Sequence, residues 1–286
     1  MSSSSLISVL VRSKNDGRFI RRTLEGLFRS AKGMEVEVVC CDDASSDDTP
    51  AIIDSFPDVK RIARPDGEYR PGRTLNHMVR QAHGDIIVFN NADAIPLDEC
   101  YLKELTAPLV AGTADAVYGN QLPRPDAQWL VVKDNTRAFG DGRIAATWTF
   151  FFSLASSAVL RKDLVEHPFD ETMRYSEDVE WAHRRQIRIA YAQNARVEHS
   201  HNYTIPELKK RFYGEGYADA QIYGSVPTLA RALAGAFKES LRDMAFLLRH
   251  PSGLGELFTS PIRRLIQKLY HRRGGIDYQK DHPAHA

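Results

Sequence analysis

The chain has 286 residues, 43% of them hydrophobic, and its 38 Lys and Arg residues nearly balance its 37 Asp and Glu residues. This composition predicts a globular protein with one large core and a smaller appendage, and the charge balance excludes a whole-molecule nucleic-acid binder. The three cysteines cannot all pair, so a disulfide framework is not expected. The sequence shows neither a signal peptide nor an apolar run of the roughly 20 residues that span a bilayer. We therefore expect a cytoplasmic protein that is not integral to a membrane.

Short apolar runs alternate with segments of helical spacing along the first two thirds of the chain. Strands are expected at residues 6–11, 35–41, 59–63, 85–89, 115–118, 150–160 and 189–191. Helices are expected at residues 20–27, 49–56, 73–82, 97–110 and 177–186. This alternation predicts an α/β fold with a doubly wound, mostly parallel sheet and helices on both faces. Residues 122–142 are expected to form a long loop where an acceptor enters.

The last part of the chain differs from the rest in composition. From residue 205 onward, helix formers with scattered basic residues predominate, so we predict a catalytic domain at residues 1–204 and a helical, basic C-terminal region at residues 205–286. Within residues 229–273, apolar residues recur at helical spacing and basic residues outnumber acidic ones. Such a stretch can lie on an anionic membrane surface as a peripheral contact. Equally, it can pack against the catalytic domain or against a second subunit in a homo-oligomer.

The turn after the first strand argues against two common classes of nucleotide-binding enzyme. Its sequence, RSKNDG at residues 12–17, has neither the GxGxxG fingerprint of dinucleotide-binding folds nor the GxxxxGK[ST] loop of P-loop proteins. The second strand instead runs into two carboxylates, Asp42 and Asp43, which can accept hydrogen bonds from a nucleobase N–H and a ribose hydroxyl. Residues 47–49 are explained equally well as the cap of the following helix.

Four ordered blocks of the sequence resemble the family-2 glycosyltransferases. The blocks are VRSKND at residues 11–16, DDASSDDT at 42–49, GRTLNHMVRQAHGDIIVFNNADAIP at 72–96 and SEDVEWAHR at 176–184. The segment that ends in HSHNYT, at residues 199–204, is most similar to the rhamnosyltransferase-like branch.

The resemblance implies a GT-A fold and an inverting glycosyltransferase. Its donor would be a UDP- or dTDP-sugar, and its acceptor a hydroxyl of a glycan or of a lipid-linked molecule in cell-surface polysaccharide synthesis. Such an enzyme would work in the cytoplasm, at the inner face of the plasma membrane if its acceptor is lipid-linked. Two alternatives stay open: a nucleotidyltransferase, which would need a Gly-rich phosphate loop, and a sugar-nucleotide-binding scaffold without activity.

The resemblance also implies which residues bind the nucleotide. The end of the first strand, from Val11 to Ser13, would contact the base, and one of Asp42 and Asp43 would hold the base and the ribose. Arg70 lies where some members place an arginine that contacts the base or a phosphate, although Arg73 is close enough in sequence to compete.

The family's metal motif, DxD, stands here as Asn91-Ala92-Asp93, with the first Asp replaced. Asp93 is therefore the expected protein ligand of Mn²⁺ or Mg²⁺, which would neutralise the charge that grows on the departing diphosphate. The other interpretation of Asp93 is a carboxylate in a turn before Pro96. His199 and His201 alternate along an extended segment, so at most one is expected to face the metal.

Two acidic residues occupy the family's position for the catalytic base. Of Glu177 and Asp178, we expect Asp178 to take the proton from the acceptor hydroxyl. The alternative is that both residues stabilise the start of a helix capped by Ser176. Among the aromatic residues, Trp148 is the candidate for stacking on an acceptor sugar, whereas Trp181 is expected in the core.

Overall fold

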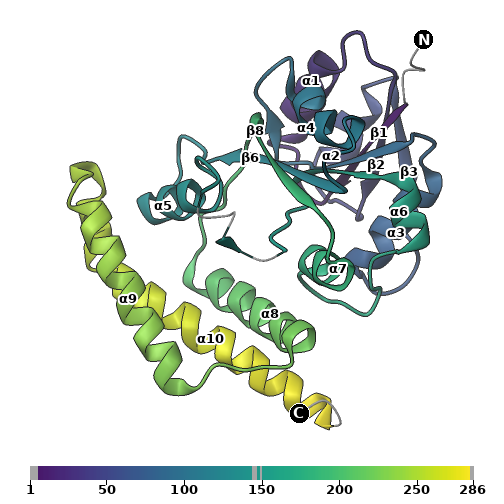
Figure 1. Ribbon diagram of the computed structural model, residues 1–286. Helices are drawn as coiled ribbons and strands as arrows, with labels where there is room; N and C mark the ends of the chain where they lie inside the picture. Colours follow the sequence, from purple (N-terminus) through teal and green to yellow (C-terminus); the bar gives the residue numbers. More distant parts are fainter. Residues whose placement is uncertain (1–5, 144–146, 149, 284–286) are drawn as a thin grey trace. The chain divides into compact units, whose positions relative to one another are not determined.

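The computed structural model describes residues 6–143, 147–148 and 150–283 (Figure 1). Two compact units make up the chain. The first unit comprises Met1–Arg124, Arg137–Thr172 and Glu177–His199. The second comprises Pro125–Thr136, Met173–Ser176 and Ser200–Ala286.

An eight-stranded sheet forms the centre of the first unit, in the order β3-β2-β1-β4-β7-β6-β8-β5. Its strands are β1 (Ile7–Ser13), β2 (Val36–Asp42), β3 (Val59–Ala63), β4 (Ile86–Asn91), β5 (Ile95–Pro96), β6 (Ala116–Leu122), β7 (Ser156–Leu160) and β8 (Ile189–Glu198). Strands β1 to β4 pair in parallel, as do β6 and β8. Strand β7 runs antiparallel between β4 and β6, and β5 runs antiparallel to β8. The predicted α/β fold is confirmed, and β7 and β5 make its sheet mixed.

Helices cover both faces of this sheet. They are α1 (Ile20–Ser30), α2 (Thr49–Asp54), α3 (Pro71–Gln81), α4 (Tyr101–Val110), α6 (Arg161–Glu166) and α7 (Glu177–Arg185). Along β1, Val9 and Val11 pack in one core cluster with α1 and α4, whereas Leu10 packs in a second cluster with α3 and α7. Successive side chains of a strand point to opposite faces, so a strand with helices on both sides is apolar throughout.

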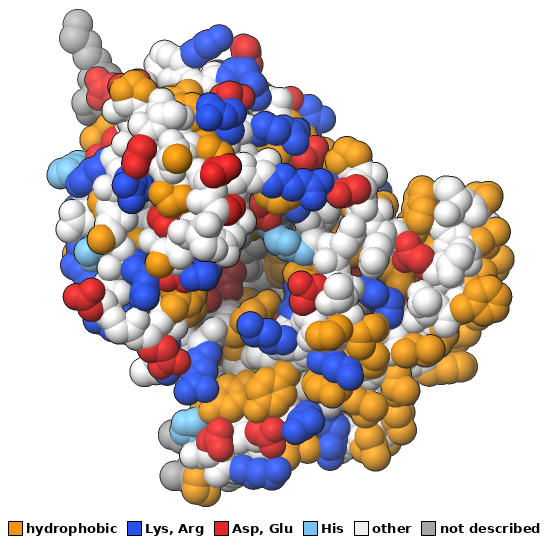
Figure 2. Space-filling model, turned by 180° about the vertical axis from the view of Figure 1, so that it is seen from behind, with side chains coloured by type: hydrophobic (Ala, Val, Ile, Leu, Met, Phe, Trp, Pro, Cys, Tyr) orange, Lys and Arg blue, Asp and Glu red, His pale blue; other side chains and the backbone are white. Residues whose placement is uncertain are grey.

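The second unit is built mainly from helices. They are the N-terminal part of α5 (Trp129–Ala138), then α8 (Ile205–Tyr223), α9 (Leu229–Leu247), the 3₁₀ helix η2 (Pro251–Leu257) and α10 (Ser260–Asp281). Helix α10 packs closely against α8 at Gly274, which has no side chain. A Cβ at this position would lie only 2.1 Å from the backbone oxygen of Tyr213. Hydrophobic side chains gather over α9 and the start of α10 (Figure 2). No helix in the described part of the chain has the length and apolarity to cross a membrane.

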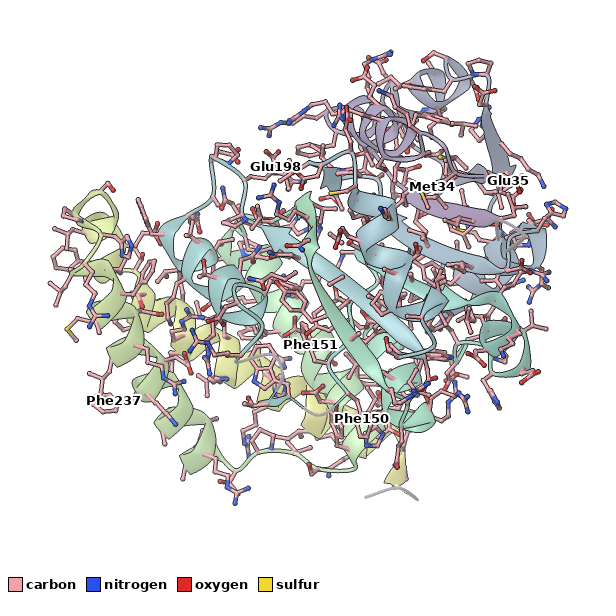
Figure 3. The ribbon with its side chains drawn as sticks, turned by 45° about the horizontal axis from the view of Figure 1, so that its top comes forward. Met34, Glu35, Phe150, Phe151, Glu198 and Phe237 are labelled. Atoms are coloured by element: carbon pink, nitrogen blue, oxygen red, sulfur yellow. The ribbon has the colours of Figure 1, made fainter. Side chains whose placement is uncertain are left out.

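Several of the predicted elements were wrong in extent. The strands expected at residues 115–118 and 189–191 continue to Leu122 and Glu198. Residues 122–142, expected to be a loop, include helix α5. The side chain of Glu256 accepts hydrogen bonds from the backbone N–H groups of Trp129 and Leu130, at 2.7 and 3.1 Å. A residue distant in sequence thus caps the N-terminus of this helix. The strand expected from residue 150 begins only at Ser156, since Phe150 has a left-handed φ of 59° that no strand accommodates. Phe150 and Phe151, labelled in Figure 3, pack against the second core cluster from the segment before β7.

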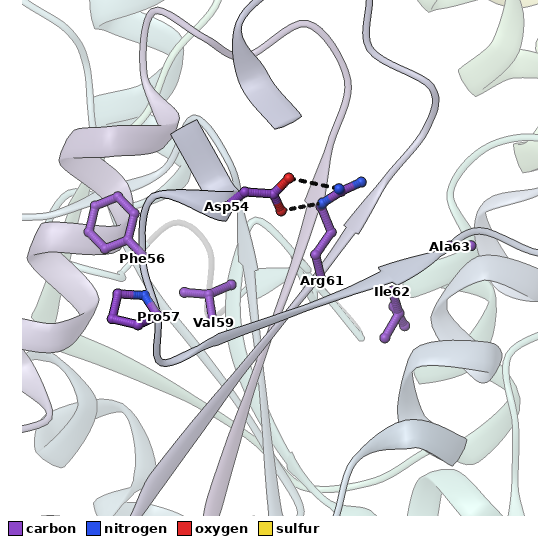
Figure 4. Close-up of a pocket in the computed structure, with 7 residues that line it drawn as sticks. All are labelled: Asp54, Phe56, Pro57, Val59, Arg61, Ile62 and Ala63. Carbon is purple, nitrogen blue, oxygen red and sulfur yellow. Dashed lines mark hydrogen bonds and ion pairs between the residues drawn. The ribbon is translucent and has the colours of Figure 1, made fainter. Parts of the chain in front are cut away.

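A pocket of about 450 Å³ lies beside strand β3 and helix α2 (Figure 4). In it, Arg61 forms two hydrogen bonds with Asp54, at 2.6 and 2.8 Å. None of the residues predicted for the functional site lines this pocket, so the Asp54–Arg61 ion pair lies outside the predicted site.

Candidate active site

The carboxyl ends of three adjacent parallel strands meet at one edge of the sheet. In the pairing of β1 with β2, Ser13 lies opposite Asp42, and in the pairing of β1 with β4, Arg12 lies opposite Asn91. A pocket of about 330 Å³ opens at this edge. The predicted site residues that line it are Ser13, Asn91, Asp43 and Asp93, together with Arg12 from the predicted stretch Val11 to Ser13. The pocket also contains Asp16 and Tyr69, which were not predicted. Open sheets of this class bind ligands at such an edge.

The two adjacent carboxylates after β2 have different surroundings. Asp42 accepts hydrogen bonds from the backbone N–H and the hydroxyl of Ser45, at 2.9 and 2.6 Å, and so holds the loop in shape. Asp43 lines the pocket and forms ion pairs with Lys14, at 3.0 Å, and with Arg64, at 2.7 Å. Of the pair, Asp43 is therefore the residue placed to meet a ligand.

Besides Asp42, two predicted nucleotide-binding residues do not line the pocket. The side chain of Val11 is fully buried in the core, which leaves only its backbone near the strand edge. Arg70 donates a hydrogen bond to Glu68 at 2.8 Å, and its neighbour Tyr69 lines the pocket instead. The roles suggested for Val11 and Arg70 stay predictions.

Asp16 adds a carboxylate to the pocket that the sequence interpretation overlooked. Its pKa is raised from the ordinary 3.8 to about 6, mainly by burial and also by the nearby charges of Asp93 and Asp47, although the backbone N–H of Lys14 and the charge of Arg124 lower it. A carboxylate with such a pKa titrates near neutral pH. Added positive charge in the pocket would favour its ionised form.

Asp93 and His199 offer a pair of ligand atoms for a divalent cation. The Oδ1 atom of Asp93 lies 3.4 Å from Nε2 of His199, and both side chains are buried. Two ligands at right angles on an ion, each about 2.1 Å from it, are about 3.0 Å apart, so this separation suits neighbouring positions around one ion. The other nitrogen, Nδ1 of His199, lies 2.8 Å from Oε1 of Gln121, whose amide nitrogen donates to Ser153. Gln121 thus orients the ring so that Nε2 faces Asp93.

Arg124 holds the opposite side of the Asp93 carboxylate. Its guanidinium donates to Oδ2 of Asp93 at 3.1 Å and to the backbone oxygen of the same residue. The guanidinium also lies 4.1 Å from the centre of the Phe19 ring, which fixes its position. Oδ1 is therefore the oxygen that faces His199. His201 belongs to the second unit, but only one residue separates it from His199 in the chain, so the two Cα atoms are at most about 7 Å apart.

Glu177 and Asp178 begin helix α7 and have different partners. Arg12 Nη1 donates to Oε1 of Glu177 at 3.2 Å. The carboxylate of Asp178 accepts hydrogen bonds from the backbone N–H groups of Leu154, at 3.3 Å, and Val179, at 2.9 Å. Burial, and then the charge of Glu177, raise the pKa of Asp178 to about 7, although both hydrogen bonds and Arg12 lower it. A carboxylate with this pKa suits general-base catalysis near neutral pH.

The two tryptophans singled out from the sequence lie in different surroundings. Trp148 is 36% exposed, and its ring centre lies 5.1 Å from that of Phe151. Trp181 is completely buried, and its indole N–H donates to the backbone oxygen of His167 at 2.7 Å. The core position expected for Trp181 is confirmed.

The family is decided by a match over more than half of the chain. Residues 8–169 match the sequence profile of Glycosyl transferase family 2. The chain belongs to this family. Among similar proteins, the O-antigen chain rhamnosyltransferase WbaN of Salmonella anatum is 28% identical over 242 residues, which cover 78% of this chain and 75% of the relative. The O-antigen chain rhamnosyltransferase RfbN of Salmonella typhimurium is 28% identical over 267 residues, which cover 85% and 82%.

Solved structures support the fold of this glycosyltransferase. The mannosyltransferase PcManGT from Pyrobaculum calidifontis, solved in complex with GDP-Man and Mn²⁺, matches it with a TM-score of 0.68 and 19% identity. The match covers 98% of this chain and 89% of that one. At this identity the likeness shows the fold alone, and the predicted GT-A fold is confirmed.

The residues that the sequence interpretation missed fall into two groups. Asp16 of the glycosyltransferase lies in the VRSKND block, shortly after a buried strand, where its polar character was a usable signal, and Arg12 was included in the predicted stretch Val11 to Ser13 without its contact to Glu177. Gln121 and Arg124 carry no comparable signal. They reach the site because β6 pairs with β8, which brings Leu122 opposite Glu198 and sets Gln121 beside His199.

Proposed function

We propose that this glycosyltransferase moves a sugar, with inversion, from a UDP- or dTDP-sugar to a hydroxyl of a glycan or lipid-linked acceptor in cell-surface polysaccharide synthesis. The observation that carries the proposal is the shared position of Arg12. It lines the pocket with Asp43 and Asp93, and it also binds Glu177, the neighbour of the candidate base. The names of both relatives, O-antigen chain rhamnosyltransferases, favour a rhamnosyl donor.

The proposed reaction needs one proton acceptor from the protein. The acceptor hydroxyl attacks the anomeric carbon opposite the diphosphate, the new C–O bond forms as the bond to the diphosphate oxygen breaks, and Asp178 takes the hydroxyl proton. With a pKa of about 7, Asp178 is ionised in about half of the molecules at neutral pH and is still basic enough to accept this proton. Trp148 is the proposed surface for stacking of the acceptor sugar.

The departing diphosphate needs positive charge at the other end of the site. We assign Asp93 and His199 as ligands of Mn²⁺ or Mg²⁺, with His201 as a further candidate. When bound, the ion would offset the charge that develops on the diphosphate. Gln121 and Arg124 keep the two ligand atoms in position. Asn91 and Ser13 line the same pocket and offer polar groups to the nucleotide.

A thermal-shift experiment with UDP, dTDP and GDP, each with and without Mn²⁺, tests this proposal. A nucleotide present at 100 times its Kd stabilises the folded state by about 2.7 kcal/mol. We expect UDP or dTDP to raise Tm more than GDP, and Mn²⁺ to enlarge the shift. Asp93→Asn should remove the metal-dependent part, whereas Asp54→Asn, in the ion pair beside β3, should not. An unchanged metal response in Asp93→Asn, or a preference for GDP, would contradict the proposal.

A further inference from the structure

One side of helix α9 exposes large apolar side chains to solvent. Six of them, at the helix and its C-cap, are between 44% and 67% exposed: Leu229, Leu233, Phe237, Leu241, Met244 and Leu248. At about 100° per residue these six side chains share an arc of about 120°. They therefore form a single band, which we term the α9 stripe, and Phe237 projects outward from it (Figure 3).

The exposure continues beyond the end of α9. Phe258 is 85% exposed and Ile262, in the first turn of α10, is 59% exposed. Scattered exposed apolar residues are ordinary on protein surfaces, but a contiguous band of them marks an interaction site. Such a band is visible as orange side chains over this part of the second unit (Figure 2).

The acidic residues of this segment are bound on the inner side of the helices. Residues 226–276 contain three of them. Asp243 is fully buried and pairs with Lys133 and with Arg264. Glu239 lies 3.6 Å from Lys133, and Glu256 caps α5. These contacts fix which side of α9 faces inward, because turning the helix would leave Asp243 buried without its cations.

Basic residues border the stripe on its solvent side. Residues 226–276 contain nine Lys and Arg residues against the three acidic ones. On α9 and directly after it, Arg231, Lys238 and Arg249 are exposed. By helical geometry these three lie within an arc of about 20°, roughly 60° beyond the edge of the stripe. The outer surface of α9 is therefore an apolar band with a basic row beside it.

We propose that the α9 stripe binds the surface of a lipid bilayer that carries anionic headgroups. The apolar side chains would enter the boundary between headgroups and acyl chains, and the basic row would contact the headgroups. A second copy of the chain is a poorer occupant. A two-fold contact through this face would place the basic rows of both copies in one interface, where their charges repel. The acidic residues of the segment could not offset this charge, because they are bound on the inner side of the helices. The membrane contact is independent of the proposed transfer reaction.

Cosedimentation of the full chain with vesicles tests this inference. The vesicles are phosphatidylcholine alone or phosphatidylcholine mixed with phosphatidylglycerol. We expect the protein to sediment with the anionic vesicles, and high salt to weaken the binding. The double variant Phe237→Ser, Leu241→Ser should lose binding to both kinds of vesicle. The double variant Lys238→Gln, Arg249→Gln should lose about tenfold or more in affinity for the anionic vesicles only.

Matched controls keep the result interpretable. Val110→Ser and Val165→Ser change exposed apolar residues of the first unit, which are 73% and 57% exposed, and should leave sedimentation unchanged. The Tm of each variant and its shift with UDP or dTDP show whether folding and the donor site are intact. Undiminished sedimentation of the Phe237, Leu241 variant would overturn the inference. A second result would also overturn it: wild-type protein fails to sediment with vesicles and forms a dimer without lipid, and the Phe237, Leu241 variant is monomeric.

Discussion

Arg12 donates a hydrogen bond from Nη1 to Oε1 of Glu177 at 3.2 Å, and so joins the end of β1 to the start of α7. The same guanidinium lines the pocket at the sheet edge. Its charge also lowers the pKa of Asp178, against burial and the charge of Glu177, which raise it. The Arg12 guanidinium therefore both lines this pocket and influences the ionisation of the proposed base.

Replacing Arg12 should change the pH dependence of transfer. In Arg12→Gln the pKa of Asp178 should rise above about 7, because a charge that stabilises its ionised form is lost. The acidic limb of the kcat profile should move to higher pH, and a shift of one unit lowers the ionised fraction at pH 7 about fivefold. Tyr69→Phe removes only a hydroxyl 3.4 Å from Arg12 and should leave the limb in place. An unmoved limb in Arg12→Gln would exclude this coupling.

The raised pKa of Asp178 should also be visible in stability. Between about pH 4 and pH 7 the folded state holds a proton that the unfolded state releases, so the free energy of unfolding falls as the pH rises through this window. Asp178→Asn cannot titrate. The Tm of this variant minus the Tm of wild type should therefore be greater at pH 7.5 than at pH 4, by at least about 3 °C. A difference in Tm that is constant with pH would show that the pKa of Asp178 is ordinary.

Gln121 should control metal affinity without being a ligand. Gln121→Met removes the acceptor 2.8 Å from Nδ1 of His199 and frees the ring to turn. Loss of such a supporting hydrogen bond costs about 10- to 100-fold in metal affinity. Titration of Mn²⁺ binding, followed by electron paramagnetic resonance, measures the change. Gln121→Glu keeps an acceptor at this position and should bind Mn²⁺ better than Gln121→Met, and equal affinities for wild type and Gln121→Met would refute the role.

The two carboxylates after β2 should respond differently to substitution. Asp43→Asn should weaken UDP or dTDP binding about tenfold with little change in Tm, because Asp43 faces the pocket. Asp42→Asn should mainly lower Tm, since this carboxylate holds the loop through Ser45. Calorimetric titration and thermal melts of both variants separate the two effects. The reverse pattern would show that Asp42 is the nucleotide contact.

Local patterns in the sequence were sufficient to predict the strands of the first unit that supply the pocket. The runs at β1, β2 and β4 are continuous and apolar, as strands covered on both faces must be, and polar residues follow each of them. The resemblance of the blocks then pointed to the pair Asp42 and Asp43, to Asp93 and to Asp178. Which of Asp42 and Asp43 faces the pocket could not be predicted, because it depends on the hydrogen bonds within the loop.

Features that depend on distant parts of the chain escaped prediction. Helix α5 is capped by Glu256, which is more than 100 residues away in sequence. Gln121 meets His199 only because β6 and β8 are neighbours in a sheet of non-consecutive order. The exposed stripe of α9 was predicted as an amphipathic pattern, but its outward side is set by the buried contacts of Asp243 with Lys133 and Arg264.

The most direct measurement compares sugar transfer by Asp178→Asn and wild-type enzyme under single-turnover conditions, with nucleotide affinity measured in the same samples. Removal of a general base lowers the rate about 10²- to 10⁴-fold. We predict a loss of this size for Asp178→Asn, with unchanged affinity for UDP or dTDP, and a smaller loss for the control Glu177→Gln. Near-normal transfer by Asp178→Asn would contradict the proposed assignment of this residue as the catalytic base.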